Sequence, residues 1–450
     1  MRFPLKLAAT LMGGAALAVV ASAPGWAASL SELLPQLIKE HNRVKAADAA
    51  VGAAKERVRA AFGGWYPTLN VVSHYGYEKF TKPLAKNTSL MTRELDFTVT
   101  QRVFDFGATA SVVKTARLNL DMARSKSALA RQSLILEAVT AYMNVFRTRE
   151  ALTLAKQSED NIKKQTELEN ALVERGAGLA TDVLQAKVQL AGAAARRVRA
   201  EGGLLAALNR YREVFGKEPG VLDDMVKPSL PVNRIPETID KAVTLALQNN
   251  LQLRSAQITT RIAREAVRSA STVGFLPSVN AIFDVKYKQD VAGLPNFQRE
   301  ITGTVQLNWP FNLGLTALNT LKASKGDLTA TEKQFADARD QIEEITRNAW
   351  DNLNTLKENA ELLHNQANIA GEFLEFARKE RILGRRSLLD VLSGETALIN
   401  ANSDAASADI DVSIAVFTLL DAMDELDLAS FEPEKRGGGI SKPTGAAGKG

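Results

Sequence analysis

The sequence predicts a mainly α-helical chain that contributes a few strands to a transmembrane β-barrel. Three features carry this prediction: an internal duplication, two very long stretches without proline, and four short segments in which apolar and polar residues alternate. Of the 450 residues, 45% are hydrophobic but only 6% are aromatic and 14 are proline, a composition typical of long helices. We expect a duplicated unit of long coiled-coil helical hairpins, with four β-strands per chain.

Composition excludes several functions. The net charge of +5 is too small to indicate a nucleic-acid partner, and the absence of cysteine excludes thiolate catalysis, disulfides and Cys-ligated zinc. The mean hydropathy is −0.12, and the one apolar run that approaches bilayer length lies at the N-terminus. A polytopic helical membrane protein is therefore not expected.

The N-terminus resembles a secretory signal peptide over residues 1–27. Arg2 and Lys6 precede an apolar run, and Gly25 and Ala27 are the small residues that signal peptidase requires, so we expect cleavage after Ala27. The alternative is an uncleaved anchor helix, for which the run is marginally short. The signal peptide predicts a mature protein outside the cytoplasm.

The chain repeats one unit twice. Three landmarks recur in the same order: Gly64-Trp65-Tyr66-Pro67 and Gly274-Phe275-Leu276-Pro277; Phe104-Asp105-Phe106-Gly107 and Phe311-Asn312-Leu313-Gly314; Asp182-Val183-Leu184 and Asp390-Val391-Leu392. The chain then divides into a first repeat (28–215), a Pro-rich linker (216–236), a second repeat (237–430) and a compositionally disordered tail (431–450).

Each repeat contains a long helical hairpin, predicted at about 107–214 and 314–428. The stretch from Gly107 to Gly176 has no proline and no internal glycine, and as one helix it would be about 100 Å long. Apolar residues recur at alternating spacings of three and four, which indicates coiled-coil packing. The chain is expected to reverse at three tip glycines: Gly176, Gly178 and Gly384.

Four segments alternate apolar and polar residues and are predicted strands: about 67–78, 94–103, 277–288 and 300–309. Their length and alternation suit transmembrane β-strands, although alternation alone also fits a half-buried soluble sheet. The predicted membrane-interface aromatics are Tyr75, Tyr77, Tyr287 and Trp309, and the predicted barrel-to-helix transitions are Pro67, Gly107, Pro277 and Gly314. Four strands cannot close a barrel, so we expect three copies to supply a barrel of about 12 strands.

The duplicated order of Gly-aromatic-x-Pro, strand pair, Phe-Asp-x-Gly, long helix, Gly turn and Asp-Val-Leu resembles the TolC family of outer-membrane efflux proteins. The resemblance implies a homotrimer with a 12-stranded transmembrane barrel in the outer membrane and a 12-helix periplasmic cylinder, so that most of the chain lies in the periplasm. An equatorial belt around the linker would complete it. It also implies a periplasmic adaptor protein and an inner-membrane transporter as partners.

Some motifs are similar to the branch of the family that serves type I secretion, in which an ABC transporter exports a protein. They are Arg93-Glu94, the run 384–392 and the run 211–216. The alternative is the channel of a proton-driven (RND) multidrug pump. A second alternative from another class is a periplasmic coiled-coil adaptor, which would share the helical seams but would not need two duplicated hairpins and four strands.

The resemblance also implies a gate at the helical tip. Asp390 corresponds to the first carboxylate of an acidic ring at the tunnel entrance, whereas Ser393 replaces the second. Arg386 corresponds to a basic residue that locks the closed tip through Thr181 and Asp182. Arg381 stands where some relatives have a tyrosine of the same lock, so that link is expected to be missing. Alternatively, the two aspartates merely cap their helices.

An enzyme is not expected. The three histidines, His41, His74 and His364, have no metal-ligand spacing, and the partial dinucleotide motif at 176–181 lacks its third glycine and follows a predicted helix rather than a strand. No cofactor is predicted.

Overall fold

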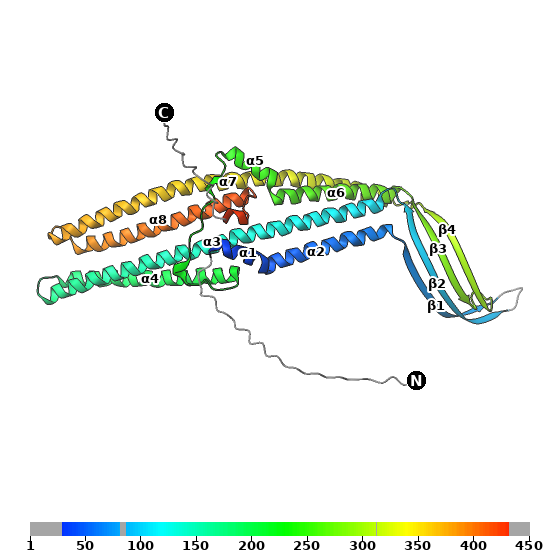
Figure 1. Cartoon of the computed structure of the whole chain (residues 1–450), viewed down its shortest axis with the longest axis horizontal. Helices are drawn as coiled ribbons and strands as arrows, with labels where there is room; N and C mark the ends of the chain where they lie inside the picture. The colour runs from blue at the N-terminus through cyan, green and yellow to red at the C-terminus, as the bar shows by residue number, and fades with distance from the viewer. Residues whose placement is uncertain (1–28, 82–86, 312, 432–450) are drawn as a thin grey trace, which may run out of the picture.

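The protein is described here by a computed structural model that covers residues 29–81, 87–311 and 313–431. It is a long helical rod with a strand sheet at one end (Figure 1). The predicted signal peptide and almost all of the predicted tail lie outside the described residues. The helices of the rod are α1 (Leu30–Glu40), α2 (Asn42–Phe62), α3 (Ala108–Glu174), α4 (Ala180–Phe215), α5 (Ile239–Asn249), α6 (Leu251–Phe275), α7 (Thr316–Ile382) and α8 (Leu388–Ala422).

The two predicted hairpins are α3 with α4 and α7 with α8. The second hairpin ends at Ala422, earlier than the predicted 428. Asp424 adopts a left-handed conformation with φ 62°, and the Glu425 amide donates to the Leu420 carbonyl at 2.8 Å. This bond pattern closes the last helical turn and stops the helix.

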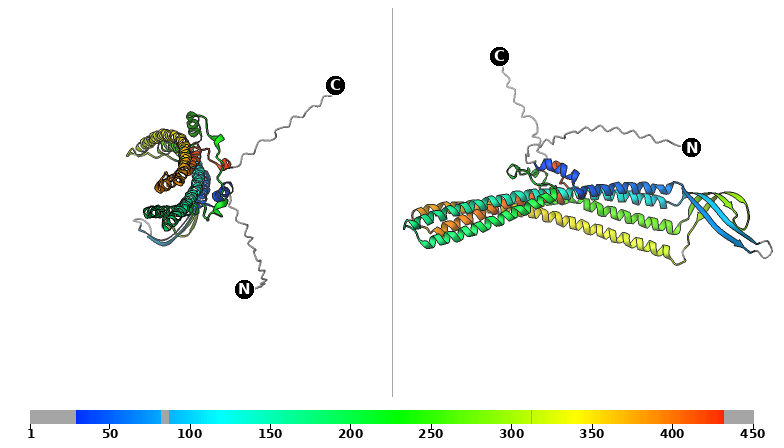
Figure 2. Two further views of the ribbon diagram at one scale, coloured as in Figure 1. Left: turned by 90° about the vertical axis from the view of Figure 1, so that its left-hand side faces the viewer. Right: turned by 90° about the horizontal axis from the view of Figure 1, so that it is seen from below.

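Helices α3 and α7 run the whole length of the rod, and shorter helices flank them. On the strand side the neighbours follow the order α2, α3, α6, α7, and towards the tip the order is α4, α3, α8, α7. Seen along the rod, the helices form an open arc (Figure 2). Among the described helices of one chain, α2, α4 and α7 therefore lie at the edges of the arc.

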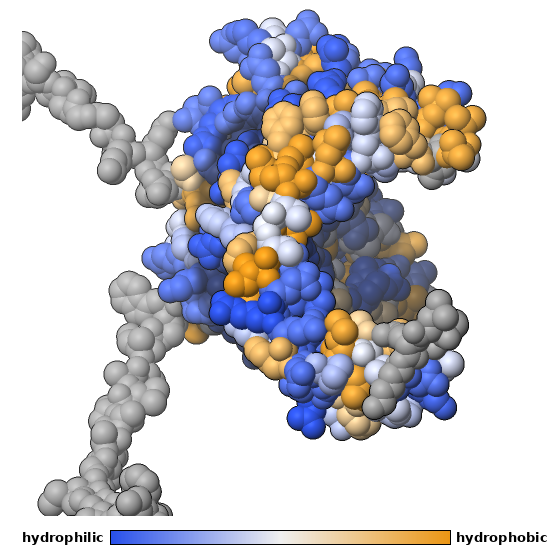
Figure 3. Space-filling view, turned by 90° about the vertical axis from the view of Figure 1, so that its right-hand side faces the viewer, coloured by the Kyte–Doolittle hydropathy of each residue, from blue (hydrophilic) through white to orange (hydrophobic). Residues whose placement is uncertain are grey.

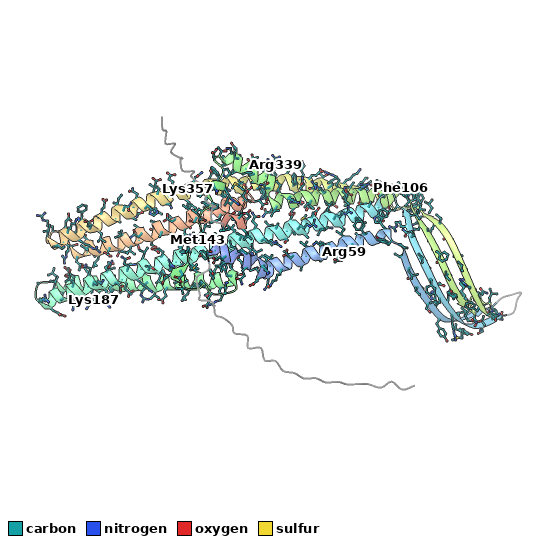
Figure 4. All side chains as sticks on the ribbon, viewed as in Figure 1. Arg59, Phe106, Met143, Lys187, Arg339 and Lys357 are labelled. Carbon is teal, nitrogen blue, oxygen red and sulfur yellow. The ribbon has the colours of Figure 1, made fainter. Side chains whose placement is uncertain are left out.

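The main hydrophobic core lies where these two halves meet. Tyr142 in α3 is fully buried there, and its hydroxyl donates to the Val226 carbonyl of the linker at 3.0 Å. Met143 beside it is 1% exposed (Figure 4). The linker runs through two 3₁₀ turns, Leu222–Asp224 and Val232–Arg234, and Arg234 donates to Asp427 at 2.8 Å. The core thus joins the linker and the end of the chain into one belt.

The strands form one antiparallel sheet in the order β1-β2-β3-β4, with bounds β1 (Thr68–Phe80), β2 (Thr88–Phe104), β3 (Ser278–Gln289) and β4 (Phe297–Asn308). Strand β2 begins earlier than the predicted residue 94, because Thr88 and its successors pair with the end of β1. The sequence there alternates less clearly, and only the hairpin pairing makes it a strand.

The strand register aligns the apolar faces of all four strands. Val71 lies opposite Phe97, Phe97 opposite Val285, and Val285 opposite Ile301. The next row is polar, with Asp96 opposite Lys286 and Lys286 opposite Glu300. One face of the sheet is therefore apolar and the other polar, as the alternation predicts.

Within the described residues, none of the helices combines the length and the apolar character needed to cross a bilayer.

Candidate functional site

The tip of the rod is formed by two glycine turns with the same hydrogen-bond pattern. Gly176 and Gly384 have φ of 77° and 70°, the left-handed region that glycine favours. In each turn the following amide, that of Ala177 or Arg385, bonds a carbonyl one turn back at 2.9 Å. Gly178 is favoured for a steric reason rather than for its backbone conformation. A Cβ at this position would lie 3.0 Å from the side chain and the backbone of Val173.

Asp182 and Asp390 occupy equivalent positions in the first turns of α4 and α8. The residues at the N-caps are Leu179 and Ser387, and the Ser387 hydroxyl accepts the Asp390 amide at 3.2 Å. The capping alternative is therefore wrong for both aspartates. Asp390, Thr181 and Ser393 are exposed at the tip, where a carboxylate in a first helical turn is favoured by the helix dipole.

The structure does not bring Arg386 to Asp182 within one chain. The Arg386 Nε lies 2.7 Å from the Glu380 carboxylate, and its guanidinium stacks over the Phe373 ring at 5.3 Å. Within the described residues of a single chain, the expected pair of Arg386 with Asp182 is therefore not formed. Arg386 follows the Gly384 turn and folds back onto α7 instead.

Arg381 makes the link that was expected to be missing. Its guanidinium lies 3.0 Å from the Glu169 carboxylate of α3 and 3.8 Å from the Asp182 carboxylate of α4. The side chain of Glu169 is only 5% exposed. An arginine can bond two carboxylates at once, so Arg381 joins the second hairpin to both helices of the first.

A second cross-link lies further from the tip and was also missed. Glu395 of α8 is 4% exposed and accepts hydrogen bonds from Arg378 of α7 and from Asn161 of α3. The helical periodicity shows which face of a helix is apolar, but it does not show which buried carboxylate faces an arginine on another helix. Glu169 and Glu395 therefore carried no usable signal in the sequence.

The transitions between strands and helices lie near the predicted residues. Pro67 and Pro277 directly precede β1 and β3, and Gly107 is the N-cap of α3 with φ 90°. Asp105, which was not predicted as a site residue, is 5% exposed and accepts the amides of Gly107 and Thr109 at 3.1 and 2.7 Å. Phe106 marks this junction (Figure 4).

The second transition differs from the first. The left-handed residue before α7 is Leu315, with φ 56°, directly after Gly314. Leu315 is also the N-cap of the helix, as Gly107 is in the first repeat. The first junction has two left-handed residues, Phe106 at φ 53° and Gly107, whereas the left-handed residue among the described residues of the second is Leu315, so the two backbone turns differ.

The predicted interface aromatics lie at two levels of the sheet. Tyr75, Tyr77 and Tyr287 lie toward the hairpin ends, and the first two are 68% and 62% exposed. Trp309 lies at the helix end, where its indole donates to the Phe275 carbonyl at 3.1 Å. Exposed aromatics at both ends of an apolar face are typical of membrane-spanning strands.

The fold defines a subunit of an elongated channel protein, built from a long helical rod and an antiparallel strand sheet. The chain belongs to the family described as outer membrane efflux protein, whose sequence model matches residues 33–217 and 242–424. The two matched segments overlap the two predicted repeats, 28–215 and 237–430. Members of this family are homotrimeric channels, not enzymes, and work with adaptor proteins and inner-membrane transporters. The protein is accordingly an outer-membrane export channel with a large periplasmic helical part.

Individual relatives agree with this assignment. The chain is 25% identical over 433 residues to the outer membrane protein TolC of Vibrio cholerae, a match that covers 94% of this chain and 96% of that protein. It is 25% identical to the alkaline protease secretion protein AprF of Pseudomonas aeruginosa, over 73% of this chain and 69% of that protein. A solved membrane protein from Pseudomonas aeruginosa has the same fold, with a TM-score of 0.78, 16% identity, and coverage of 88% of this chain and 93% of that one. The adaptor alternative has no support among these findings.

Proposed function

We propose that three copies of this chain close into one exit duct, which conducts a protein substrate of type I secretion from an ABC transporter and its periplasmic adaptor to the cell exterior. The export channel is a property of the family, whereas the trimer of this chain, its gate residues and its cargo are proposals.

The observation that carries the trimer is a pair of coiled-coil seams that are exposed along the described part of one chain. On α4 the seam is exposed and has alternating spacings of four and three: Leu184, Val188, Ala191, Ala195, Val198, Gly202 and Leu205. On α7 the matching seam is Leu362, Gln366, Ile369, Phe373 and Phe376, and a groove of about 420 Å³ runs along it. Because α4 and α7 are the two edge helices near the tip, each seam would pack against the next copy.

The sheet requires the same closure. Strands β1 and β4 are the two edges, and within the described residues each has a neighbouring strand on one side only. Such edges are intolerable in lipid, so β4 of one copy would pair with β1 of the next until the barrel closes.

Gating is assigned to the tip. Arg381 with Glu169 and Asp182 would hold the two hairpins of one chain together, and opening would separate them. Asp390 and its two copies would form an acidic ring at the entrance, with Thr181 beside it. Arg386 would support the tip through its ion pair with Glu380 of α7.

The names of two relatives bear on the cargo. AprF is named as an alkaline protease secretion protein, which favours protein export. The proton-driven drug pump remains the alternative, because the relative BepC of Brucella suis is named as an outer membrane efflux protein. The discriminating experiment expresses the chain in cells that lack their own channel and measures protein export by an ABC system beside drug susceptibility. Restored drug resistance without restored export would contradict the type I assignment.

The trimer is tested by native mass spectrometry of the full chain in detergent, and by conductance in planar bilayers. Val188→Glu places a charge in the α4 seam and is expected to reduce the trimer fraction. Gln185→Glu adds the same charge at an exposed position of α4 outside the seam and should leave the trimer intact. A monomeric wild-type chain without channel activity would contradict the proposal.

A further inference from the structure

The apolar face of the sheet carries an uneven set of charges. Among the described strand residues on this face, the charged side chains are three, and all are basic: Lys79 on β1, Arg93 on β2 and Arg299 on β4. The carboxylates of the strands, including Glu94, Asp96 and Glu300, lie in the rows of the opposite face.

The three basic residues lie at one level, toward the hairpin ends. The strand register places Arg93 in one row with Tyr75 and Gln289, and Arg299 in the neighbouring row with Tyr287. Lys79 lies two rows beyond Tyr75. All three side chains are exposed. Figure 3 views the molecule from the strand end, where hydrophobic and hydrophilic residues lie side by side on the surface.

The two arginines are placed on aromatic rings. The Arg93 guanidinium lies 5.8 Å from the centre of the Tyr75 ring, and that of Arg299 lies 5.9 Å from the centre of the Tyr287 ring. Stacking on a ring orients a guanidinium and leaves most of its donors free. Asp290, in the loop after β3, attracts Arg93 from beyond the strand end.

A cation on a lipid-facing strand is tolerated near the membrane interface but not at the bilayer centre. At that level the groups available to an outward-pointing guanidinium are the headgroups of the lipid, and a guanidinium binds phosphate with paired hydrogen bonds. Lys79, Arg93 and Arg299 form a belt of cations that can bind phosphate. Among the described strand residues, no carboxylate lies on the same face as this belt.

We propose that Lys79, Arg93 and Arg299 form a phosphate-binding belt that holds anionic lipid headgroups of the outer leaflet against the barrel. The inference rests on the proposed trimeric barrel, in which this face meets lipid. Its partner is a lipid, and the aromatic rings beneath the arginines contact the start of the acyl chains.

The test uses the full chain purified in detergent, with native mass spectrometry to count bound lipids. The probes are phosphatidylglycerol, which is anionic, and phosphatidylcholine, which has no net charge. Wild-type protein is expected to bind phosphatidylglycerol in preference to phosphatidylcholine. Replacing both arginines (Arg93→Gln with Arg299→Gln) should lower the affinity for phosphatidylglycerol about tenfold and remove most of the preference over phosphatidylcholine, whose phosphate charge is balanced by its choline group.

The matched control, Lys286→Gln with Lys288→Gln, removes the same charge from the opposite face of the sheet and should leave lipid binding unchanged. The belt is contradicted if the arginine variant binds as wild type does, if the control loses as much affinity, or if wild type does not distinguish the two lipids. Displacement of the lipid by inorganic phosphate at equal concentration would assign the site to a free anion instead. The same spectra report the oligomeric state, so a monomer would count against the trimer separately from the lipid result.

Discussion

The Arg381 guanidinium lies 3.0 Å from the carboxylate of Glu169, a side chain that is 5% exposed. These two residues belong to different hairpins, and Asp182 completes the contact at 3.8 Å. The contact joins both repeats of the chain at the end where the rod would open.

Arg381→Ala is expected to raise the single-channel conductance in planar bilayers, because it removes the cation that links the two hairpins. Asp182→Ala should have the same direction and a smaller effect, since its contact is longer. Arg385→Ala, at an exposed neighbour in the turn, serves as the control. Equal conductance of wild type and both variants would eliminate Arg381 as a gate residue.

Arg381→Ala also leaves the Glu169 carboxylate buried beside no cation of α7. Breaking a buried pair from one side is strongly destabilising, by up to about 3 kcal/mol for a partly exposed arginine. Adding Glu169→Gln to Arg381→Ala should recover part of the thermal stability, because the neutral amide is less costly to bury. Thermal unfolding of the three proteins measures this, and no recovery would mean that the charge of Glu169 is not the source of the loss.

Glu395→Ala is expected to destabilise the tip half of the rod by about 2 kcal/mol, because Arg378 and Asn161 lose a shared acceptor. Glu372→Ala, at an exposed position of α7, should change the free energy of unfolding little. Hydrogen exchange of α3 and α8 near Asn161 would locate the effect. Protection as high as in wild type would show that the cross-link is dispensable.

Asp421 lies near the end of α8 and should make the stability of the main hydrophobic core depend on pH. Burial raises the pKa of Asp421 from 3.8 to about 6, so the folded protein binds a proton more tightly than the unfolded chain. The contribution of Asp421 to the free energy of unfolding is therefore complete below about pH 4 and is lost as the pH rises to about 6. Asp421→Asn should therefore stabilise the protein by about 3 kcal/mol at pH 7.5 and by much less at pH 4.5. Denaturant unfolding at the two pH values measures the difference, and an equal gain at both would refute the assignment.

Gly107→Ala should destabilise the protein by about 1–2 kcal/mol, because φ of 90° is strained for any residue with a Cβ. Gly326→Ala lies inside α7 with open space around it and should be neutral or slightly stabilising. The pair separates backbone strain from the mere addition of a methyl group. Thermal unfolding in detergent provides the comparison, and a neutral Gly107→Ala would contradict the strain.

Much of the fold follows from local patterns. The glycines at 176 and 384 mark the turns because a left-handed residue there needs no side chain. The alternation in β1, β3 and β4 sets their faces, since the side-chain period of a strand is two. The early start of β2 could not be predicted, because residues from Thr88 onward become a strand through pairing with β1.

The sequence by itself determined the long helices and the strand faces, which depend on residues close together along the chain, and the family, which depends on motifs that recur in a fixed order. Only the tertiary structure decided that Arg381 rather than Arg386 reaches Asp182, and that Glu169 and Glu395 join the hairpins. The reason is geometric. Helices of this length drift in phase against one another, and a left-handed turn redirects every side chain after it, so pairing across hairpins depends on how the helices are superposed.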